Sequence, residues 1–447
     1  SGGFALYARK KAHLRAPWKE VSHSKVGMGA LVVLSVYVII GLLDSIHYHP
    51  QADAKGKLET AEVLSVFDTL VTPLRTRHEK TYSAPLATHL YAKENIELPD
   101  GGTIRDYPRL EYGGAHLQDP EQDWSADVLL LTLRGVIEGL LVWLLLAALL
   151  IFWSARLSGW DFRRKLRAIR QSETQIPWGT LLLTSGALLV VGFAAGELSL
   201  HYHLLGTDKV GEDVFYQALK SIRTGLLIGT LTTLVMLPAA ILLGIMAGYF
   251  RGWVDDIIQY TYTTLNSIPG VLLIAAAILM MQIYMSNHQE EFASLTQRAD
   301  LRLLFLCMIL GVTSWTGLCR LLRGETFKLR ELEYVQASQA FGVGHFTIIG
   351  RHILPNVLHI VLITLVLDFS GLVLAEAVLS YVNIGVDPTM NSWGNMINGA
   401  RLEMAREPIV WWSLAAALIF MFTLVLAANL FSDVVRDAFD PRLRTTR

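Results

Sequence analysis

The chain has 447 residues, 52% of them hydrophobic, and its 38 basic residues almost balance its 39 acidic ones. The formal net charge of −1 hides an uneven distribution, with basic residues beside the apolar runs, so it gives no argument for a nucleic-acid partner. The only cysteines, Cys307 and Cys319, fall in one apolar run, which excludes a disulfide framework and a zinc ribbon. The apolar runs decide the class, because a helix needs about 20 apolar residues to cross a bilayer core.

Eight stretches approach or meet that length, which predicts an all-α polytopic membrane protein. Residues 1–25 are basic and are expected to form a cytoplasmic tail before a first span at 26–43, since positive residues stay inside. Residues 44–127 are polar and acidic and would form a small extracytoplasmic insert. Residues 128–200 hold the second and third spans, and the basic loop between these spans independently supports a cytoplasmic N-terminus.

Residues 201–223 are expected outside the membrane, ahead of a core at 224–431 and a basic cytoplasmic tail at 432–447. The five spans of the core are predicted at 224–249, 254–285, 301–322, 353–382 and 409–431. Asn266 and Pro269 should kink or break the span that contains them.

Motifs of catalysis and nucleotide binding are missing from the sequence. It holds no GxxxxGK[ST] phosphate loop, no HExxH, no paired CxxC and no GxSxG. The chain is therefore expected to bind no ATP by a phosphate loop and to be no hydrolase.

Two His-x-His pairs, at residues 47–49 and 201–203, fall on the predicted outer side. Metal binding would require further ligands that converge on them, and interfacial, solvated histidines are the alternative. No metal site is predicted. Trp393, Trp411 and Trp412 fit the aromatic belts of a membrane interface.

Asp368 and Glu376 are ionisable residues inside the seventh span, where a charge is costly. Eight residues separate them, so they diverge by roughly 80° on a helix and could line one broad cavity face. Pairing with polar groups on neighbouring helices is the alternative. As a proton relay they would make the chain an ion-coupled secondary transporter. Arg134 and Glu138 are expected to form a local salt bridge across one helical turn.

Residues 331–355 form a polar stretch between the sixth and seventh spans and are expected in the cytoplasm. Its first part has the spacing of a short amphipathic helix, which Gly342 is well placed to end. A second short helix and Pro355, in the first turn of the next span, would follow. Such a hinged device suits docking onto a partner protein, although an ordinary loop has similar spacing.

From about residue 201 to 444 the sequence resembles the C-type permease subunit of bacterial peptide, oligopeptide and nickel ABC importers. The family's external GTD-x-x-G-x-D pattern matches Gly206, Thr207, Asp208, Gly211 and Asp213. Residues 375–377, 392–396 and 436–442 match further family motifs.

The polar stretch itself resembles the family's EAA loop. Gln336, Ala337 and Ser338 occupy the EAA positions, Gly342 the glycine, and Leu354 and Pro355 the end. Glu333 and Tyr334, which precede it, are typical of the peptide branch, and Glu333 is the expected acidic contact with an ATPase.

The resemblance implies the transmembrane domain of a type I importer, with six usual spans plus an extra pair. It implies a non-catalytic subunit of the bacterial inner membrane with both termini in the cytoplasm. Its expected partners are a homologous second permease, two cytoplasmic ATPase subunits that hold ATP and Mg, and an extracytoplasmic binding protein. This chain would bind no cofactor. Peptides are the expected cargo, and nickel, opines, glycosides and peptide antibiotics are the alternatives.

Overall fold

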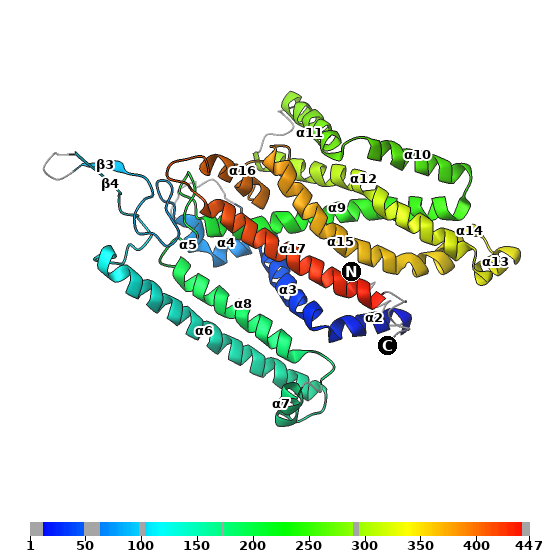
Figure 1. The fold of residues 1–447 in the computed structure, drawn as a ribbon, viewed down its shortest axis with the longest axis horizontal. Helices are drawn as coiled ribbons and strands as arrows, with labels where there is room; N and C mark the ends of the chain where they lie inside the picture. The colour runs from blue at the N-terminus through cyan, green and yellow to red at the C-terminus, as the bar shows by residue number, and fades with distance from the viewer. Residues whose placement is uncertain (1–11, 49–62, 98–102, 172–173, 289–294, 440–447) are drawn as a thin grey trace. The chain divides into compact units, whose positions relative to one another are not determined.

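The computed structural model describes residues 12–48, 63–97, 103–171, 174–288 and 295–439 (Figure 1). The chain divides into two compact units, of which unit 1 holds Ser1–Arg223 and Asn391–Ala438 and unit 2 holds Thr224–Met390 and Phe439–Arg447. Within the described ranges, eight helices are long and apolar enough to cross a membrane, as the sequence predicts.

Unit 1 contains the spans that precede the GTD pattern and the last span of the chain. Its helices are α2 (Ala12–His23), α3 (Lys25–Ser45), α6 (Pro120–Leu157), α7 (Phe162–Arg170), α8 (Trp178–Ser199), the start of α9 (Val214–Phe250), α16 (Trp393–Glu403) and α17 (Trp412–Phe439). The Tyr37 hydroxyl on α3 donates a hydrogen bond to the Phe420 carbonyl on α17 at 2.9 Å. This bond joins the first and last spans, which are far apart in the sequence.

The second and third spans, α6 and α8, form a hairpin closed by α7 (Figure 1). Glycines allow the two backbones to approach closely. A Cβ added at Gly135 would lie 2.6 Å from the Cα of Ala194, and one at Gly139 would lie 2.9 Å from the Cα of Val190. The hairpin therefore depends on the lack of a side chain at these positions.

The insert adds short strands to an otherwise helical chain. Strand β1 (His47–Tyr48) pairs antiparallel with β2 (Leu64–Ser65), and β3 (Glu94–Glu97) pairs antiparallel with β4 (Thr103–Asp106). Two short helices, α4 (Val66–Leu70) and α5 (Thr72–Thr76), follow β2. The Ser65 and Asp68 side chains each accept a hydrogen bond from the other's backbone N–H, which caps α4.

Lys220, in the first turns of α9, ties the insert to the spans. Its ammonium lies 2.6 Å from Asp44 Oδ1 at the end of α3 and 2.8 Å from Asp68 Oδ1 on α4. Tyr216 and Ser65 donate further hydrogen bonds to these carboxylates. Burial alone would raise the pKa of Asp68, but its bonds and its attraction to Lys220 lower the pKa to about 2. The cluster is buried and paired, as a charge removed from water must be.

Unit 2 contains the rest of α9 and the helices up to the end of the seventh span. They are α10 (Trp253–Ser267), α11 (Gly270–Asn287), α12 (Leu295–Arg330), α13 (Glu333–Ala340), α14 (His345–Ile348), the π-helix η1 (Ile349–Ile353) and α15 (Leu354–Tyr381). The predicted fifth span is broken at Pro269, which has no N–H to donate. Of its two halves, only α11 meets the criteria for a membrane span.

Two helices extend beyond the ends predicted for their spans. Helix α9 begins already at Val214, because an Asp213 carboxylate oxygen accepts the Tyr216 N–H at 3.0 Å and so caps the helix. Helix α17 continues to Phe439, where the sequence analysis places a tail. Apolar periodicity predicts the membrane-embedded part of a helix, so it underestimates the length of a helix whose ends extend into water.

We expect the replacement of Gly135 by leucine to destabilise the packing of α6 against α8. The new side chain would collide with backbone atoms of α8, and such overpacking costs about 1–3 kcal/mol. The apparent melting temperature of the purified protein in mild detergent measures the loss. Gly179→Leu, on α8 where an added Cβ meets nothing within 4 Å, is the matched control and should melt like the wild type.

Candidate functional site

Segment 331–355 has the helix, turn and helix that its sequence predicts. Helix α13 spans Glu333–Ala340, and Gly342 follows it with φ of +73°, a conformation that favours glycine. The Val343 N–H donates to the Ser338 carbonyl at 3.1 Å and closes the turn. Helix α14 and η1 lead into α15, with Pro355 in its first turn.

Three apolar side chains fix this segment to unit 2. Val335 on α13, Ile348 on α14 and Ile353 in η1 are each fully buried. They belong to one core cluster with residues of α9, α10, α12 and α15. A displacement of the segment must therefore either move these helices or expose buried apolar surface at about 25 cal/mol per Å².

Polar contacts hold the segment to the turn between α9 and α10. Arg330 donates to the Tyr249 carbonyl at 2.8 Å, and the Tyr249 hydroxyl lies 2.9 Å from His345 Nδ1. Arg251 pairs with Glu331 at 2.5 Å on the surface. Tyr249, Arg330 and His345 line a pocket of about 350 Å³ beside Gly342. Arg330 thus anchors the start of the segment to α9.

The exposed surface of the segment carries the predicted contact residues. Glu333, Tyr334, Gln336, Ala337 and Gly342 are exposed, and Ser338, Leu354 and Pro355 are half-buried. Phe341 and Phe346 are 87% and 86% exposed, on either side of the glycine turn. The sequence analysis did not select these phenylalanines, although two aromatic residues in a polar, glycine-rich stretch are a detectable signal.

Arg323, near the cytoplasmic end predicted for α12, forms a two-pronged ion pair. Its Nε and Nη2 atoms lie 2.5 and 2.7 Å from the two carboxylate oxygens of Asp255 on α10. The bond from Arg323 lowers the pKa of Asp255, against the effect of burial. This planar pairing fixes α10 against α12 at the base of segment 331–355. Lys328, by contrast, pairs only with Glu325 on its own helix.

The two acidic residues of α15 have different surroundings. Glu376 is buried, 2% exposed, and accepts a hydrogen bond from Ser380 at 2.6 Å. Asp368 is half-buried. This partner lies on the same helix, so the bond does not match the predicted pairing of Glu376 with a neighbouring helix. Arg302 on α12, which the sequence analysis missed, is also buried and donates to the Gly385 carbonyl at 3.0 Å, beyond the end of α15.

The GTD pattern in unit 1 folds as a tight turn against the insert. The Thr207 hydroxyl accepts the Ser83 N–H at 2.7 Å and donates to the Thr81 carbonyl at 2.8 Å. Asp208 accepts two backbone N–H groups of its own turn. A Cβ at Gly206 would lie 2.4 Å from the Ser83 carbonyl oxygen, and one at Gly211 would overlap that of Glu79. Both glycines have positive φ, which adds to the need for glycine.

A buried histidine lies between two carboxylates at this junction. His203 Nδ1 is 2.7 Å from Asp213, and its Nε2 is 3.4 Å from Glu79, an ion-pair distance without good hydrogen-bond geometry. Burial alone would lower the pKa of His203, but the hydrogen bond with Asp213 and the negative charges of Asp213 and Glu79 raise it to about 9. The interpretation of His203 as solvated is therefore wrong. His49 lies outside the described residues.

Glu79 joins the insert to the same histidine. Its carboxylate also accepts the backbone N–H groups of Glu111, Tyr112 and Gly113. Burial alone would raise its pKa, but the ion pair with His203 and these three N–H groups lower the pKa to about 2. Within the described residues, no group of three or more His, Cys, Asp or Glu side chains could hold a metal ion.

Two tryptophans expected in an interfacial belt are instead buried. Trp393 donates to the Ala218 carbonyl at 3.0 Å, and Trp412 donates to the Thr207 carbonyl at 2.9 Å. Both are 1% exposed, whereas Trp411 is exposed as predicted. The indole N–H bonds explain the difference, because a buried tryptophan needs an acceptor.

Eight helices long and apolar enough to cross a membrane, within the described residues, define a polytopic membrane protein. Residues 240–445 match the family described as binding-protein-dependent transport system inner membrane component. The chain is 32% identical over 245 residues to the glutathione transport system permease protein of Pectobacterium atrosepticum, covering 54% of this chain and 74% of that protein.

Other relatives give the same result. The dipeptide transport system permease protein of Bacillus subtilis is 28% identical, with 54% of this chain and 69% of the relative covered. The oligopeptide transport system permease protein of Mycobacterium bovis is 31% identical, with 55% and 78% covered. This chain belongs to the inner-membrane permease components of peptide-family ABC importers. Such components are non-catalytic and work with ATPase and substrate-binding partners.

The stability of unit 1 should depend on pH through His203 and Glu79. The pKa of His203 is raised from 6.5, so its contribution is complete below about pH 6.5 and is lost as the pH rises through 9. The pKa of Glu79 is lowered from 4.5, so its contribution is complete above pH 4.5 and is lost as the pH falls toward 2. The apparent melting temperature should be highest between about pH 4.5 and 6.5 and should fall as the pH rises from 6.5 to 9.

His203→Gln should flatten the alkaline limb of this profile. His78→Gln is the control, because His78 precedes Glu79 in the chain and is exposed. An unchanged alkaline limb in His203→Gln would show that the network does not govern the transition.

Proposed function

We propose that this permease forms half of a translocation pathway for peptides and couples it to ATP hydrolysis through segment 331–355. The observation that carries the proposal is the pair of exposed phenylalanines on a segment whose other face is buried in unit 2. Exposed aromatic side chains of this kind suit a protein partner. The relatives are transport proteins for glutathione, dipeptides and oligopeptides, which supports peptides over nickel, opines, glycosides or peptide antibiotics as cargo.

The complete importer in this proposal contains a second, homologous permease, two cytoplasmic ATPase subunits and an extracytoplasmic binding protein. ATP and Mg bind to the ATPase subunits, and this chain holds no cofactor. Each ATPase receives one segment such as 331–355. Closure of the ATPase pair around ATP displaces the segment, and the spans turn from inward-facing to outward-facing. Hydrolysis then allows inward release of the peptide.

The buried anchors make the segment suitable for this transmission. Val335 and Ile348 lie in the same core cluster as residues of α9, α12 and α15, so a force on α13 reaches the spans through packed side chains. The ion pair of Arg323 with Asp255 extends the rigid unit to α10. Glu333 remains the acidic contact that we propose for the ATPase, with Tyr334 and Gln336 beside it.

We place both termini and segment 331–355 in the cytoplasm, and the GTD pattern with the insert outside. The basic residues of 1–25 and of the loop between α6 and α8 support this orientation. Asp368, which is half-buried, is the acidic residue of α15 that we assign to the pathway. Glu376 would act with it only after leaving its bond with Ser380.

Labelling of single cysteines tests the orientation. Cys307 and Cys319 are buried and are replaced by serine first. We expect a membrane-impermeant maleimide to label Lys209→Cys in intact spheroplasts and to label Phe346→Cys only after permeabilisation. Both native positions are exposed, so access to the reagent depends on the side of the membrane. Labelling of Phe346→Cys in intact spheroplasts would contradict the proposed function.

Removal of the two exposed phenylalanines tests the coupling. Loss of an aromatic contact at an interface centre costs about 2 kcal/mol, or about thirtyfold in affinity. Phe341→Ala with Phe346→Ala should therefore leave the chain in the membrane with fewer ATPase subunits after purification. Peptide uptake by proteoliposomes should fall, together with the ATPase activity that the loaded binding protein stimulates.

Phe152→Ala is the matched control, because Phe152 is an exposed phenylalanine on the span α6. Gly342→Pro should act like the double variant, since proline cannot adopt the positive φ of this turn. Normal coupled uptake in both test variants would exclude the proposed role of segment 331–355.

A further inference from the structure

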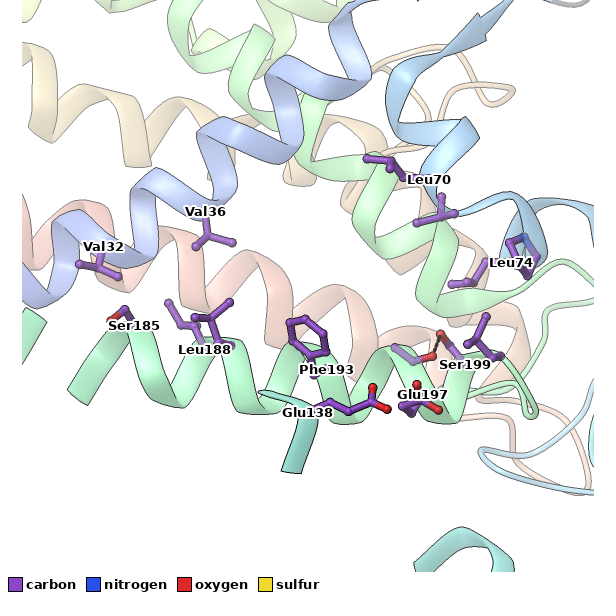
Figure 2. A pocket seen from close by; sticks show the side chains of 16 residues that line it. Val32, Val36, Leu70, Leu74, Glu138, Ser185, Leu188, Phe193, Glu197 and Ser199 are labelled. Carbon is purple, nitrogen blue, oxygen red and sulfur yellow. Dashed lines mark hydrogen bonds between the residues drawn. The ribbon is translucent and has the colours of Figure 1, made fainter. Parts of the chain in front are cut away.

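Unit 1 contains a groove of about 740 Å³ between α3 and α8, bounded at one end by residues 70–74 of the insert (Figure 2). Its volume lies within the range of about 300–1,000 Å³ that small-molecule sites occupy. Both helices are spans of the membrane. The groove therefore opens at the depth of the lipid and forms no part of segment 331–355.

The two ends of the groove differ in chemistry. Val32, Val36 and Leu188 line one end, where α3 faces α8 (Figure 2). Glu138 and Glu197 line the other, near the end of α8 (Figure 2). An apolar trough that leads to a pair of carboxylates matches an amphipathic ligand.

Arg134 lies beside these carboxylates, and Arg77 lies at the residue that follows α8. Arg134 Nε is 3.0 Å from Glu138 Oε1 and 3.8 Å from Glu197 Oε2, and Arg77 donates to the carbonyl of Leu200, which also lines the groove. The four charged groups sum to zero. The polar end therefore complements a ligand that carries one positive and one negative charge.

Glycines on α8 provide the space. An added Cβ at Gly192 or Gly196, which line the groove, would meet nothing within 4 Å. By contrast, a Cβ at Gly186, on the face toward α6, would lie 2.8 Å from the Trp143 ring. Thus α8 has one glycine packed against its hairpin partner and two that leave the groove open.

We propose that this groove binds one phospholipid with a zwitterionic, amine-bearing headgroup. Its acyl chains lie along Val32, Val36 and Leu188, which keeps the apolar walls out of contact with water. Its ammonium group donates hydrogen bonds to Glu138 and Glu197, and its phosphate accepts from Arg134, whose side chain is 59% exposed. The lipid fastens the α6–α8 hairpin to the first span.

A protein helix fits the groove less well. With its side chains a helix is about 10–12 Å across, so about 740 Å³ would hold only about two turns of one. Acyl chains are thinner and adapt to an irregular trough. An anionic headgroup would bring its negative charge to two carboxylates without an amine to compensate, which is unfavourable.

Native mass spectrometry of the purified importer complex tests the proposal, with phosphatidylethanolamine, phosphatidylcholine and phosphatidylglycerol added in equal amounts. We expect one retained lipid per copy of this chain, with phosphatidylethanolamine preferred about tenfold over phosphatidylglycerol, as charge-assisted hydrogen bonds imply. Gly192→Leu should fill the groove and remove that lipid. Gly179→Leu, with the same substitution on the same helix outside the groove, should retain it.

Glu197→Gln supplies a second, milder variant, which should retain a lipid and lose the preference for the amine. Equal lipid counts in Gly192→Leu and Gly179→Leu would overturn the proposal, as would equal retention of the three lipids by the wild type. A cross-link from a cysteine at Leu188 to a partner subunit would overturn it in favour of a protein occupant. None of these outcomes depends on peptide uptake, so they leave the proposed function to its own test.

Discussion

A buried imidazole between two carboxylates holds the insert to the segment that carries the GTD pattern. His203 follows α8, Asp213 starts α9 and Glu79 lies in the insert, so three segments meet at one charge. Lys220 repeats this arrangement with Asp44 and Asp68. Removal of one partner would leave a buried charge uncompensated, which costs about 3–5 kcal/mol. The insert is therefore built into the importer subunit and is more than an appended loop.

The kind of group that is buried differs between the GTD pattern and segment 331–355. On the side that we assign to the exterior, ion pairs are buried and order the turns of the GTD pattern. In segment 331–355 the buried groups are apolar, and the exposed surface is aromatic and polar. Apolar anchors tolerate small shifts in direction better than hydrogen-bonded ion pairs do. The buried anchors of the segment that we propose to transmit movement are thus contacts that are not strongly directional.

The sequence allowed the spans, the glycine stop at Gly342 and the salt bridge of Arg134 with Glu138 to be predicted, because each depends on local spacing. It did not reveal that His203, Trp393 and Trp412 are buried, since Glu79, Ala218 and Thr207, which contact them, lie far away in the chain. The groove beside Gly192 was also beyond prediction, because it depends on how α3 and α8 pack. The extent of α9 was missed because its cap, Asp213, lies outside the apolar run.

The break at Pro269 limits what can surround this part of the subunit. A helix end leaves its last carbonyl groups without intrahelical partners, and hydrocarbon offers them none. Residues 266–272 are nevertheless mostly exposed in the single chain. Lipid tails are thus unsuitable neighbours for the break, which requires water or another protein chain beside it. The helix break at Pro269 thus leaves backbone carbonyl groups of unit 2 that need hydrogen-bond donors from outside this chain.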